Sequence, residues 1–286
     1  MIANYFTLFA PLLASLAAAS AITRQSTTKL SDGCGQAQGI TAGVHTIKVG
    51  SRDRQFNISI PENYDNSRPH QLIFTFHFAN YNMSTVSQGD RMEPYYGLKS
   101  RAGNDGILIA PDGLDAGWAN TCGRDLAFVD VMIEQVEASL CIDQTKRFAM
   151  GHSFGGGMTF SLACSRPNAF RAFSGVNTAE LSGCDGGLVV PVSYLGYHGV
   201  NDDKVEISRG LDLARRVAKT NGCEPEDGIE DSYPANGSLT YSRTDFMDCT
   251  KPVSFIAFDG GHDRAPLGNG NPWAPDTIWK FFEQAP

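Results

Sequence analysis

Short runs of almost continuous apolar residues recur along the chain, separated by stretches whose apolar residues repeat at helical spacing. Such runs are typical of strands buried on both faces of a parallel sheet. They predict strands at Gln71–Phe76, Gly106–Ala110, Arg147–Met150, Val192–Tyr197 and Val253–Phe258. The helical spacing predicts helices at Leu126–Leu140, Gly156–Cys164, Ile207–Lys219 and Thr277–Gln284. Strands that alternate with helices indicate a mostly parallel α/β sheet flanked by helices, whose ligands bind beyond the carboxyl ends of the strands.

The N-terminal region predicts an exported protein. Its apolar stretch ends in Ala19-Ser20-Ala21, small residues of the kind that signal peptidase accepts. The stretch is shorter than the roughly 20 residues that a membrane anchor needs. We therefore interpret residues 1–21 as a cleaved signal peptide and expect no membrane attachment. Residues 22–32 then form a short polar arm, and residues 33–286 a single catalytic domain.

The charge and the motif content of the chain exclude several classes of function. The chain has 23 basic and 31 acidic residues, a net charge of −8, and no run of Lys or Arg. This balance lacks the basic footprint of a nucleic-acid-binding protein. We find no H-x-x-x-H, no clustered Cys and His, no G-x-G-x-x-G at the start of a helix and no Walker pattern. We therefore expect no metal, no cofactor and no nucleic-acid partner, and a monomer that acts on a neutral substrate.

The cysteines indicate an oxidising compartment, because seven are present without a C-x-x-C pair. An odd number suggests three disulfides and one free thiol. Three N-glycosylation sequons, at Asn57, Asn82 and Asn236, are consistent with export. Together with the leader, these features predict a secreted, extracellular protein.

A nucleophile elbow is the strongest chemical motif. Gly151-His152-Ser153-Phe154-Gly155 matches G-x-S-x-G and directly follows the predicted strand Arg147–Met150. The turn from strand into helix is so tight that glycine is needed on either side of the nucleophile. The Ser153 hydroxyl would then lie at a helix N-terminus, where backbone N–H groups favour an oxyanion. The motif in this context predicts an α/β-hydrolase fold with Ser153 as nucleophile.

A serine nucleophile needs a histidine base and a carboxylate that orients it, in the chain order Ser, acid, His. Only His198 and His262 follow Ser153. We favour His262, which follows the strand Val253–Phe258, and expect His198 to fix the adjacent loop. Asp202 and Asp203 both follow the strand Val192–Tyr197; we choose Asp202 as the acid and expect Asp203 to be solvated.

The oxyanion would be held by two backbone N–H groups. One comes from the residue after the nucleophile, Phe154, and the other from the loop after the first predicted strand, where Phe78 is the candidate. His77 precedes the nucleophile, so we expect it to brace this loop rather than to act as a base. His152 is expected to pack inside the elbow.

With these motifs placed, the sequence resembles the secreted fungal feruloyl esterases of carbohydrate esterase family one. The residues that carry the resemblance are Gly33–Gly35, Phe76-His77, Gly117–Asn120, Gly151–Gly157, Ser161–Cys164, Ser182–Gly187, His198–Asp202 and Phe258–His262. The resemblance implies a Ser153, Asp202, His262 triad that hydrolyses the ester between ferulate or p-coumarate and arabinose in xylan. It also implies the disulfides Cys34–Cys184, Cys141–Cys164 and Cys223–Cys249, with Cys122 free. The family often has Gly where this chain has Phe78, which changes that edge of the pocket.

A planar hydroxycinnamoyl group requires an apolar, aromatic-lined slot. We expect Trp118 and Phe78 to form it. Two other esterases would fit the same scaffold, an acetylxylan esterase and a polyhydroxyalkanoate depolymerase. A catalytically inactive cell-wall-binding protein that kept the fold is the alternative of another class.

Overall fold

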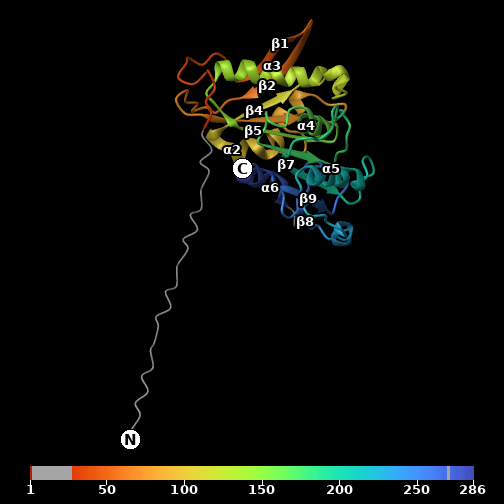
Figure 1. Ribbon diagram of the computed structural model, residues 1–286. Coiled ribbons are helices and arrows are strands. Elements are labelled where there is room, and N and C mark those ends of the chain that lie inside the picture. The colour runs from red at the N-terminus through yellow and green to blue at the C-terminus, as the bar shows by residue number, and fades with distance from the viewer. Residues whose placement is uncertain (2–27, 269–270) are drawn as a thin grey trace.

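The computed structural model describes Met1, residues 28–268 and residues 271–286 (Figure 1). The predicted leader, apart from Met1, and residues 22–27 of the predicted arm lie outside the described residues. The arm's last residues run beside the body of the protein, since Leu30 forms a β-bridge with Asp143.

A nine-stranded sheet forms the centre, in the order β1-β2-β4-β3-β5-β6-β7-β9-β8. Figure 1 shows this succession from β1 at one end to β8 at the other. The strands are β1 Gly43–Val49, β2 Arg52–Ser59, β3 His70–Phe76, β4 Gly106–Pro111, β5 Ile142–His152, β6 Ala172–Val176, β7 Ser193–Gly199, β8 Tyr241–Asp245 and β9 Val253–Phe258. The six strands from β4 to β9 in this order are parallel, whereas β1, β2 and β8 pair antiparallel at the two edges. A separate small ribbon joins β10 Leu267–Gly268 to β11 Asn271–Pro272.

All five predicted strands are present in the central sheet, and four other strands of that sheet were missed. Strands β1 and β8 lie at the edges, where most of their residues are at least partly exposed, so they lack the continuous apolar run of a buried strand. Strand β6 is fully buried but only five residues long, and it contains a glycine. The mostly parallel α/β architecture that the apolar pattern predicts is confirmed.

Helices cover both faces of the sheet, and each face has its own apolar core. On one face pack α3 Arg124–Ser139, α4 Phe154–Ser165 and α5 Ile207–Thr220; on the other pack α1 Met83–Gln88, α2 Leu98–Ala102 and α6 Ala274–Gln284. Short 3-10 turns connect them at Pro94–Gly97, Gly103–Asp105, Leu114–Ala116, Thr121–Gly123 and Ile229–Ser232. Among the described residues, no helix has the length and apolar character needed to cross a bilayer.

Three disulfides are present, and two of them differ from the expected pairing. Cys223–Cys249 is as predicted, but the other bridges are Cys34–Cys141 and Cys164–Cys184. The predictions Cys34–Cys184 and Cys141–Cys164 are therefore wrong.

The reason is the path of the N-terminal segment. Ser31 N–H donates to the Ile142 carbonyl at 3.0 Å, and Gly33 N–H donates to that of Glu137 at 2.8 Å, so Cys34 lies beside the start of β5. The Cα atoms of Cys34 and Cys141 are consequently 4.0 Å apart. Cys122 is free, as predicted, and it is exposed.

Candidate active site

Ser153 occupies a strained turn between the central strand β5 and helix α4. Its backbone has φ 55° and ψ −120°, a conformation that costs energy for a residue other than glycine. A Cβ on Gly151 would lie 2.3 Å from the backbone of Gly155, and one on Gly155 would lie 2.2 Å from the carbonyl oxygen of Phe76. Both flanking positions therefore require glycine, as the motif predicts, and the turn leaves the serine side chain half-exposed.

Asp202 and His262 come together from loops that follow β7 and β9. The Nδ1–H of His262 donates to Oδ2 of Asp202 at 2.7 Å, and the carboxylate side chain is fully buried. The other carboxylate oxygen accepts the N–H groups of Lys204 and Val205, both at 2.9 Å. Asp203, the alternative acid, is exposed and, within the described part of the chain, pairs only with Lys204. The structure thus brings Asp202 and not Asp203 to the histidine.

The hydrogen bonds fix the charge of the acid and the tautomer of the base. Burial alone would raise the pKa of Asp202, but hydrogen bonds from His198, Val205, His262 and Lys204 outweigh it and hold that pKa well below the usual carboxyl range. Since Nδ1 of His262 donates to the carboxylate, Nε2 of the neutral ring carries the lone pair that a general base needs.

His198 lies behind the acid and is buried. Its Nε2–H faces two acceptors, the Val205 carbonyl at 2.7 Å and Oδ2 of Asp202 at 3.1 Å. A Cβ on Gly210 would lie 2.2 Å from Nδ1 of this ring, so helix α5 packs directly against it. His198 therefore fixes the loop that carries Asp202, as expected. Its Nε2–H is directed to Val205 and Asp202, so the ring does not serve as a base for Ser153.

Asn177 connects the loop of His262 to the end of β7, and sequence reasoning missed it. This fully buried residue follows β6; its Nδ2 donates to the carbonyl of Asp263 at 2.7 Å, and its Oδ1 accepts Gly199 N–H at 2.8 Å. The loop of His262 is thereby tied to the end of β7. The signal in the sequence was weak, because a single Asn after a short apolar segment is common in turns.

A cavity of about 580 Å³ opens above Ser153 and His262. One wall is aromatic, with the rings of Phe78 and Tyr81 4.2 Å apart between centroids. The guanidinium of Arg264 lies 4.5 Å from the centre of the Phe78 ring. Three cationic side chains and one anionic side chain line this cavity, namely Arg91, Lys204, Arg264 and Asp263. The cavity is thus locally cationic on a chain whose net charge is −8.

The loop after β3 lies against the elbow. Inside it, His77 is fully buried; its Nδ1–H donates to the Phe78 carbonyl at 2.9 Å and its Nε2 accepts Gly113 N–H at 2.9 Å. Burial lowers the pKa of His77, so the ring stays neutral and keeps both bonds. The N–H groups of Phe78 and Phe154 donate to no protein acceptor among the described residues. Phe78 lines the same cavity as Ser153, and Phe154 follows Ser153 directly in the chain, so both donors belong to the surroundings of the serine.

His152 packs between the aromatic wall and the base. Its ring lies edge-on to Phe78, with centroids 5.3 Å apart, and 4.7 Å from the ring of His262. Neither ring nitrogen has a hydrogen-bond partner in the described part of the chain. Burial, reinforced by the nearby His262 and Arg264, lowers the pKa of His152 well below its ordinary value. His152 is thus a neutral packing residue, as expected.

Comparison with known proteins gives close relatives. The chain is 51% identical over 255 residues to a probable feruloyl esterase C of Aspergillus niger, covering 89% of this chain and 92% of the relative. It is 49% identical, with the same coverage, to feruloyl esterase C of Emericella nidulans. The chain belongs to the feruloyl esterase C family. It is accordingly an enzyme, a carboxylic ester hydrolase. No protein-family model matches it.

A solved structure supports the fold. A "CE1 ferulic acid esterase" of Anaeromyces mucronatus, in complex with ferulic acid, superposes with a TM-score of 0.57 at 15% identity, over 92% of this chain and 93% of that one. At this identity the likeness shows the fold alone. The feruloyl esterase described here therefore has the α/β-hydrolase fold that the elbow predicted.

Trp118 is not a pocket residue of this feruloyl esterase, contrary to our expectation. Its side chain is fully buried, packs edge-on against Phe76 with centroids 5.1 Å apart, and donates from Nε1 to the carbonyl of His77 at 2.8 Å. The ring supports the loop of Phe78 from below and cannot touch a ligand. Phe78, by contrast, does line the serine cavity.

The cationic residues of the cavity were missed. Arg264 lies two residues after His262, so proximity to the base could have indicated it. Arg91 belongs to a segment far from every motif, and nothing in the sequence points to it.

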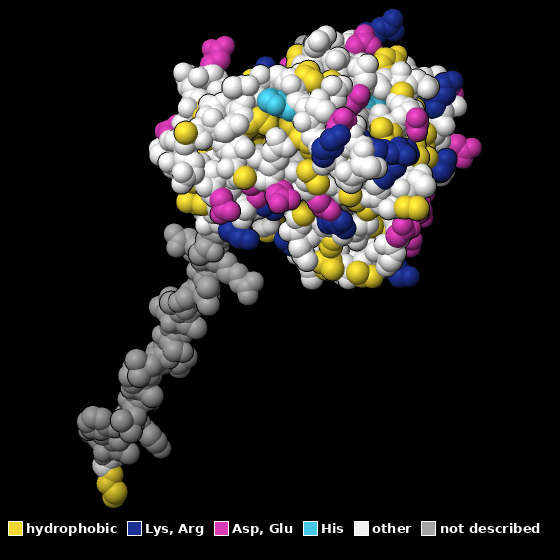
Figure 2. All heavy atoms as spheres, turned by 90° about the horizontal axis from the view of Figure 1, so that it is seen from above, with side chains coloured by type: hydrophobic (Ala, Val, Ile, Leu, Met, Phe, Trp, Pro, Cys, Tyr) yellow, Lys and Arg dark blue, Asp and Glu magenta, His cyan; other side chains and the backbone are white. Residues whose placement is uncertain are grey.

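Within residues 28–268 and 271–286, no three His, Cys, Asp or Glu side chains gather closely enough to hold a metal ion. On the face shown in Figure 2, basic and acidic side chains are interspersed.

Proposed function

We propose that this chain is a secreted serine esterase of carbohydrate esterase family one that cleaves the ester between hydroxycinnamic acids, ferulate or p-coumarate, and arabinose of plant cell-wall xylan. The observation that carries the proposal is the 2.7 Å bond between buried Asp202 and His262 in the cavity that also contains the strained Ser153. Kinship to feruloyl esterases supports a hydroxycinnamoyl acyl group and cell-wall esters as the substrate class.

The reaction is acyl transfer in two halves. Nε2 of His262 takes the proton of Ser153, whose oxygen attacks the ester carbonyl. The N–H groups of Phe78 and Phe154 hold the oxyanion of the tetrahedral intermediate, and each such donor is worth about 10²–10³ in rate. The protonated His262 gives its proton to the departing sugar oxygen. Water, activated by the same ring, then releases the hydroxycinnamate and restores Ser153.

Asp202 acts through the histidine. Its low pKa keeps it ionised at every pH at which the enzyme would work, so it holds Nδ1–H in place and stabilises the imidazolium that forms. The Phe78 ring offers an apolar face beside Ser153 for the acyl group, and Arg264 backs that ring.

Export and architecture are part of the proposal. Three disulfides fit an oxidising compartment and so support export. The proposal includes cleavage of residues 1–21 and a single catalytic domain over 33–286 that acts as a monomer. Asn82 and Asn236 are exposed sequons, whereas Asn57 is half-buried and its Oδ1 accepts the Tyr95 hydroxyl at 2.9 Å. Glycosylation at Asn82 and Asn236 should therefore exceed that at Asn57, as site occupancy by mass spectrometry would measure.

The test is hydrolysis of methyl ferulate, methyl p-coumarate and p-nitrophenyl acetate by the wild-type protein and by Ser153→Ala. We expect cinnamate turnover that disappears with the hydroxyl while circular dichroism stays unchanged. Cleavage of the acetate alone would replace the proposal by an acetylxylan-type esterase. Undiminished cinnamate hydrolysis by Ser153→Ala would exclude Ser153 as nucleophile.

A further inference from the structure

The cationic side chains of the serine cavity neither carry a proton nor hold the oxyanion in the proposed reaction. Arg91, Lys204 and Arg264 line this cavity together with one acidic residue, Asp263. The Asp263 carboxylate already has a partner in its own loop, since its Oδ2 accepts Gly261 N–H at 3.0 Å. The chain as a whole has a net charge of −8 and repels anions at long range, so a cationic cavity on it requires an explanation.

Arg264 is held against the aromatic wall of the cavity. Its guanidinium lies 4.5 Å from the centre of the Phe78 ring and 5.4 Å from the centre of the Tyr81 ring. One of its nitrogens also lies 3.5 Å from a carboxylate oxygen of Asp90, a residue that does not line the cavity. The charge of Arg264 is therefore fixed in position and partly neutralised.

Arg91 differs from the other two cations because it has no partner. It is exposed, it lines the cavity, and its side chain forms no ion pair and no hydrogen bond within residues 28–268 and 271–286. Lys204, by contrast, pairs with Asp203 at 3.1 Å. A guanidinium presents a planar fork of N–H donors that matches the two oxygens of a carboxylate. Arg91 is thus the cation of this cavity that is available to an anionic ligand.

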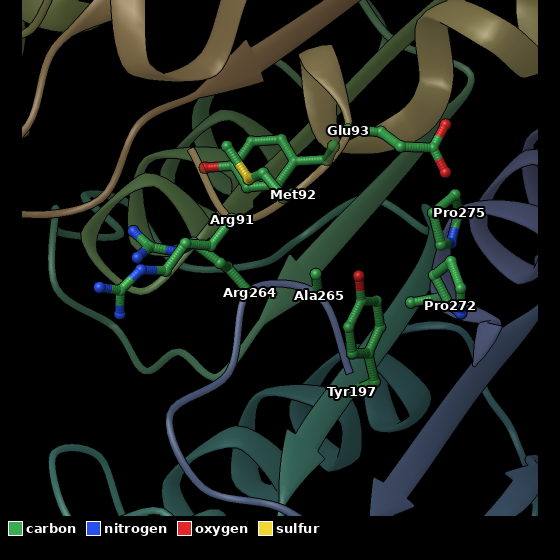
Figure 3. Close-up of a pocket in the computed structure, with 10 residues that line it drawn as sticks. Arg91, Met92, Glu93, Tyr197, Arg264, Ala265, Pro272 and Pro275 are labelled. Atoms are coloured by element: carbon green, nitrogen blue, oxygen red, sulfur yellow. The ribbon is translucent and has the colours of Figure 1, made fainter. Parts of the chain in front are cut away.

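A smaller cavity, of about 210 Å³, adjoins the serine cavity, and Arg91 and Arg264 line both. Figure 3 shows the Tyr197 hydroxyl facing this smaller cavity, whereas the side chains of Arg91 and Arg264 turn away from Tyr197 and from the prolines on its far wall. The charge of both arginines is therefore concentrated on the side of the serine cavity, where the ester is cleaved.

The chemistry of the substrate limits where an anionic group could be. In the ester, the carboxyl group of ferulate or p-coumarate is part of the bond, and the phenol group, like that of tyrosine, is uncharged near neutral pH. The acyl part is therefore neutral until it is released. A negative charge on the intact substrate would lie on the alcohol part, where a sugar acid carries a carboxylate.

We propose that the serine cavity recognises a carboxylate on the alcohol part of the ester and that Arg91 determines this preference. The inference rests on the proposed function and names a class of substrate, hydroxycinnamoyl esters of sugars or oligosaccharides that carry a uronic acid group. Arg91 contacts the carboxylate. Arg264 and Lys204, which already have acidic partners, add a weaker attraction.

The experiment compares two ferulate esters that differ in charge alone, O-feruloyl glucuronate and O-feruloyl glucuronamide, in which a neutral amide replaces the carboxylate. We expect the wild-type kcat/KM to be about 2- to 5-fold higher for the acid than for the amide, as for a partly exposed ion pair. In Arg91→Gln this ratio should fall towards one. Lys204→Gln should lower the ratio less, because Asp203 already pairs with that lysine.

Salt gives a second readout, because the Debye length shrinks from about 30 Å at 0.01 M to about 3 Å at 1 M ionic strength. The wild-type ratio should fall towards one over this range, and the ratio of Arg91→Gln should depend on salt much less. The matched control is Arg68→Gln. It removes an exposed arginine just before the amino end of β3, at the sheet edge opposite to Ser153, and should keep the wild-type ratio.

A wild-type ratio of one would overturn the inference, and so would an equal loss on both esters in Arg91→Gln, which indicates that Arg91 only shapes the cavity. A larger change of the ratio in Lys204→Gln than in Arg91→Gln would contradict the assignment of Arg91. Hydrolysis of methyl ferulate but of neither sugar ester would exclude the substrate class. Failure of the proposed function is recognised separately, because the wild-type protein would then not hydrolyse methyl ferulate either.

Discussion

The nucleophile elbow and the loop of the base are built in different ways. Around Ser153 the backbone is packed so closely that a single methyl group at Gly151 would lie 2.3 Å from the backbone of Gly155. Directly before His262 there is more room, since a Cβ on Gly261 would meet nothing nearer than 3.7 Å. That loop is positioned by hydrogen bonds from His262 to Asp202, from Asn177 to the Asp263 carbonyl and from Asn201 N–H to the Gly260 carbonyl. The elbow is therefore specified by its own sequence, whereas the base depends on residues distant along the chain.

The largest effect should come from breaking the bond that orients the base. Asp202→Asn removes the negative charge beside His262. The amide can also donate to Nδ1, which leaves the ring in the wrong tautomer, so we expect kcat to fall about 10⁴-fold. The matched control is Asp203→Asn, which alters an exposed neighbour that pairs only with Lys204 and should leave kcat within twofold of wild type. Steady-state kinetics on methyl ferulate measure both. Similar losses in the two variants would contradict the choice of Asp202.

The close packing of the elbow predicts a difference between two glycines. Gly155→Ala forces a methyl group into a backbone carbonyl that cannot move freely, which should cost about 3 kcal/mol or more of stability. Gly261→Ala, in the open loop, should change stability by less than about 0.5 kcal/mol. Denaturant unfolding of both variants gives the comparison. Equal stabilities would show that the elbow tolerates rearrangement and that its glycines are not required.

The dependence of the base loop on distant residues is tested at Asn177. Asn177→Asp keeps the acceptor for Gly199 N–H but loses the donor to the Asp263 carbonyl, so the loop of His262 loses its tether. A misplacement of the base by about 1 Å costs up to about 10²-fold in rate, and we expect a 10- to 100-fold lower kcat with little change in KM. Asn201→Ala, whose side chain bonds only Asn236, is the control. Wild-type kcat in Asn177→Asp would contradict this role.

The smallest effect concerns acid stability. Burial depresses the pKa of His152 in the folded protein, so only the unfolded chain takes up this proton below about pH 6.5. Stability therefore falls as the pH falls, by up to about 1.4 kcal/mol per pH unit for this group. Leucine cannot take up the proton, so the stability of His152→Leu relative to wild type should rise between pH 7 and pH 5. A constant difference across this range, measured by thermal unfolding, would indicate that His152 takes up its proton equally in the folded and the unfolded state.

The contrast between locally specified features and features that depend on distant residues also explains what could be predicted from the sequence. The five apolar strands and the elbow are local patterns, because burial on both faces and a tight turn each demand particular residues in succession. Asp202 and His262 could be placed because few candidates follow Ser153. The pairing of Cys34 with Cys141 and of Cys164 with Cys184 depends instead on where an irregular segment crosses the sheet.

The direction in which side chains point was the other feature that could not be predicted from the sequence. Trp118 lies in a loop near the site, but its ring turns inward and supports His77. Tyr197 was recognised as the end of an apolar strand, yet nothing in its neighbours indicated that its hydroxyl faces a cavity. Arg91 and Arg264 reach the serine cavity through loops whose paths are set by tertiary packing. The cationic lining residues therefore required the structure, whereas Phe78 could be predicted from its loop.

The central claim, that the Ser153 oxygen carries the hydroxycinnamoyl group during turnover, can be tested by trapping the acyl-enzyme. Wild-type protein mixed with p-nitrophenyl ferulate is quenched in acid within the first turnovers, digested and examined by mass spectrometry. The account predicts one feruloyl group on the peptide that contains Ser153, and none in Ser153→Ala. Turnover without an acylated Ser153, or a feruloyl group on another residue, would contradict it.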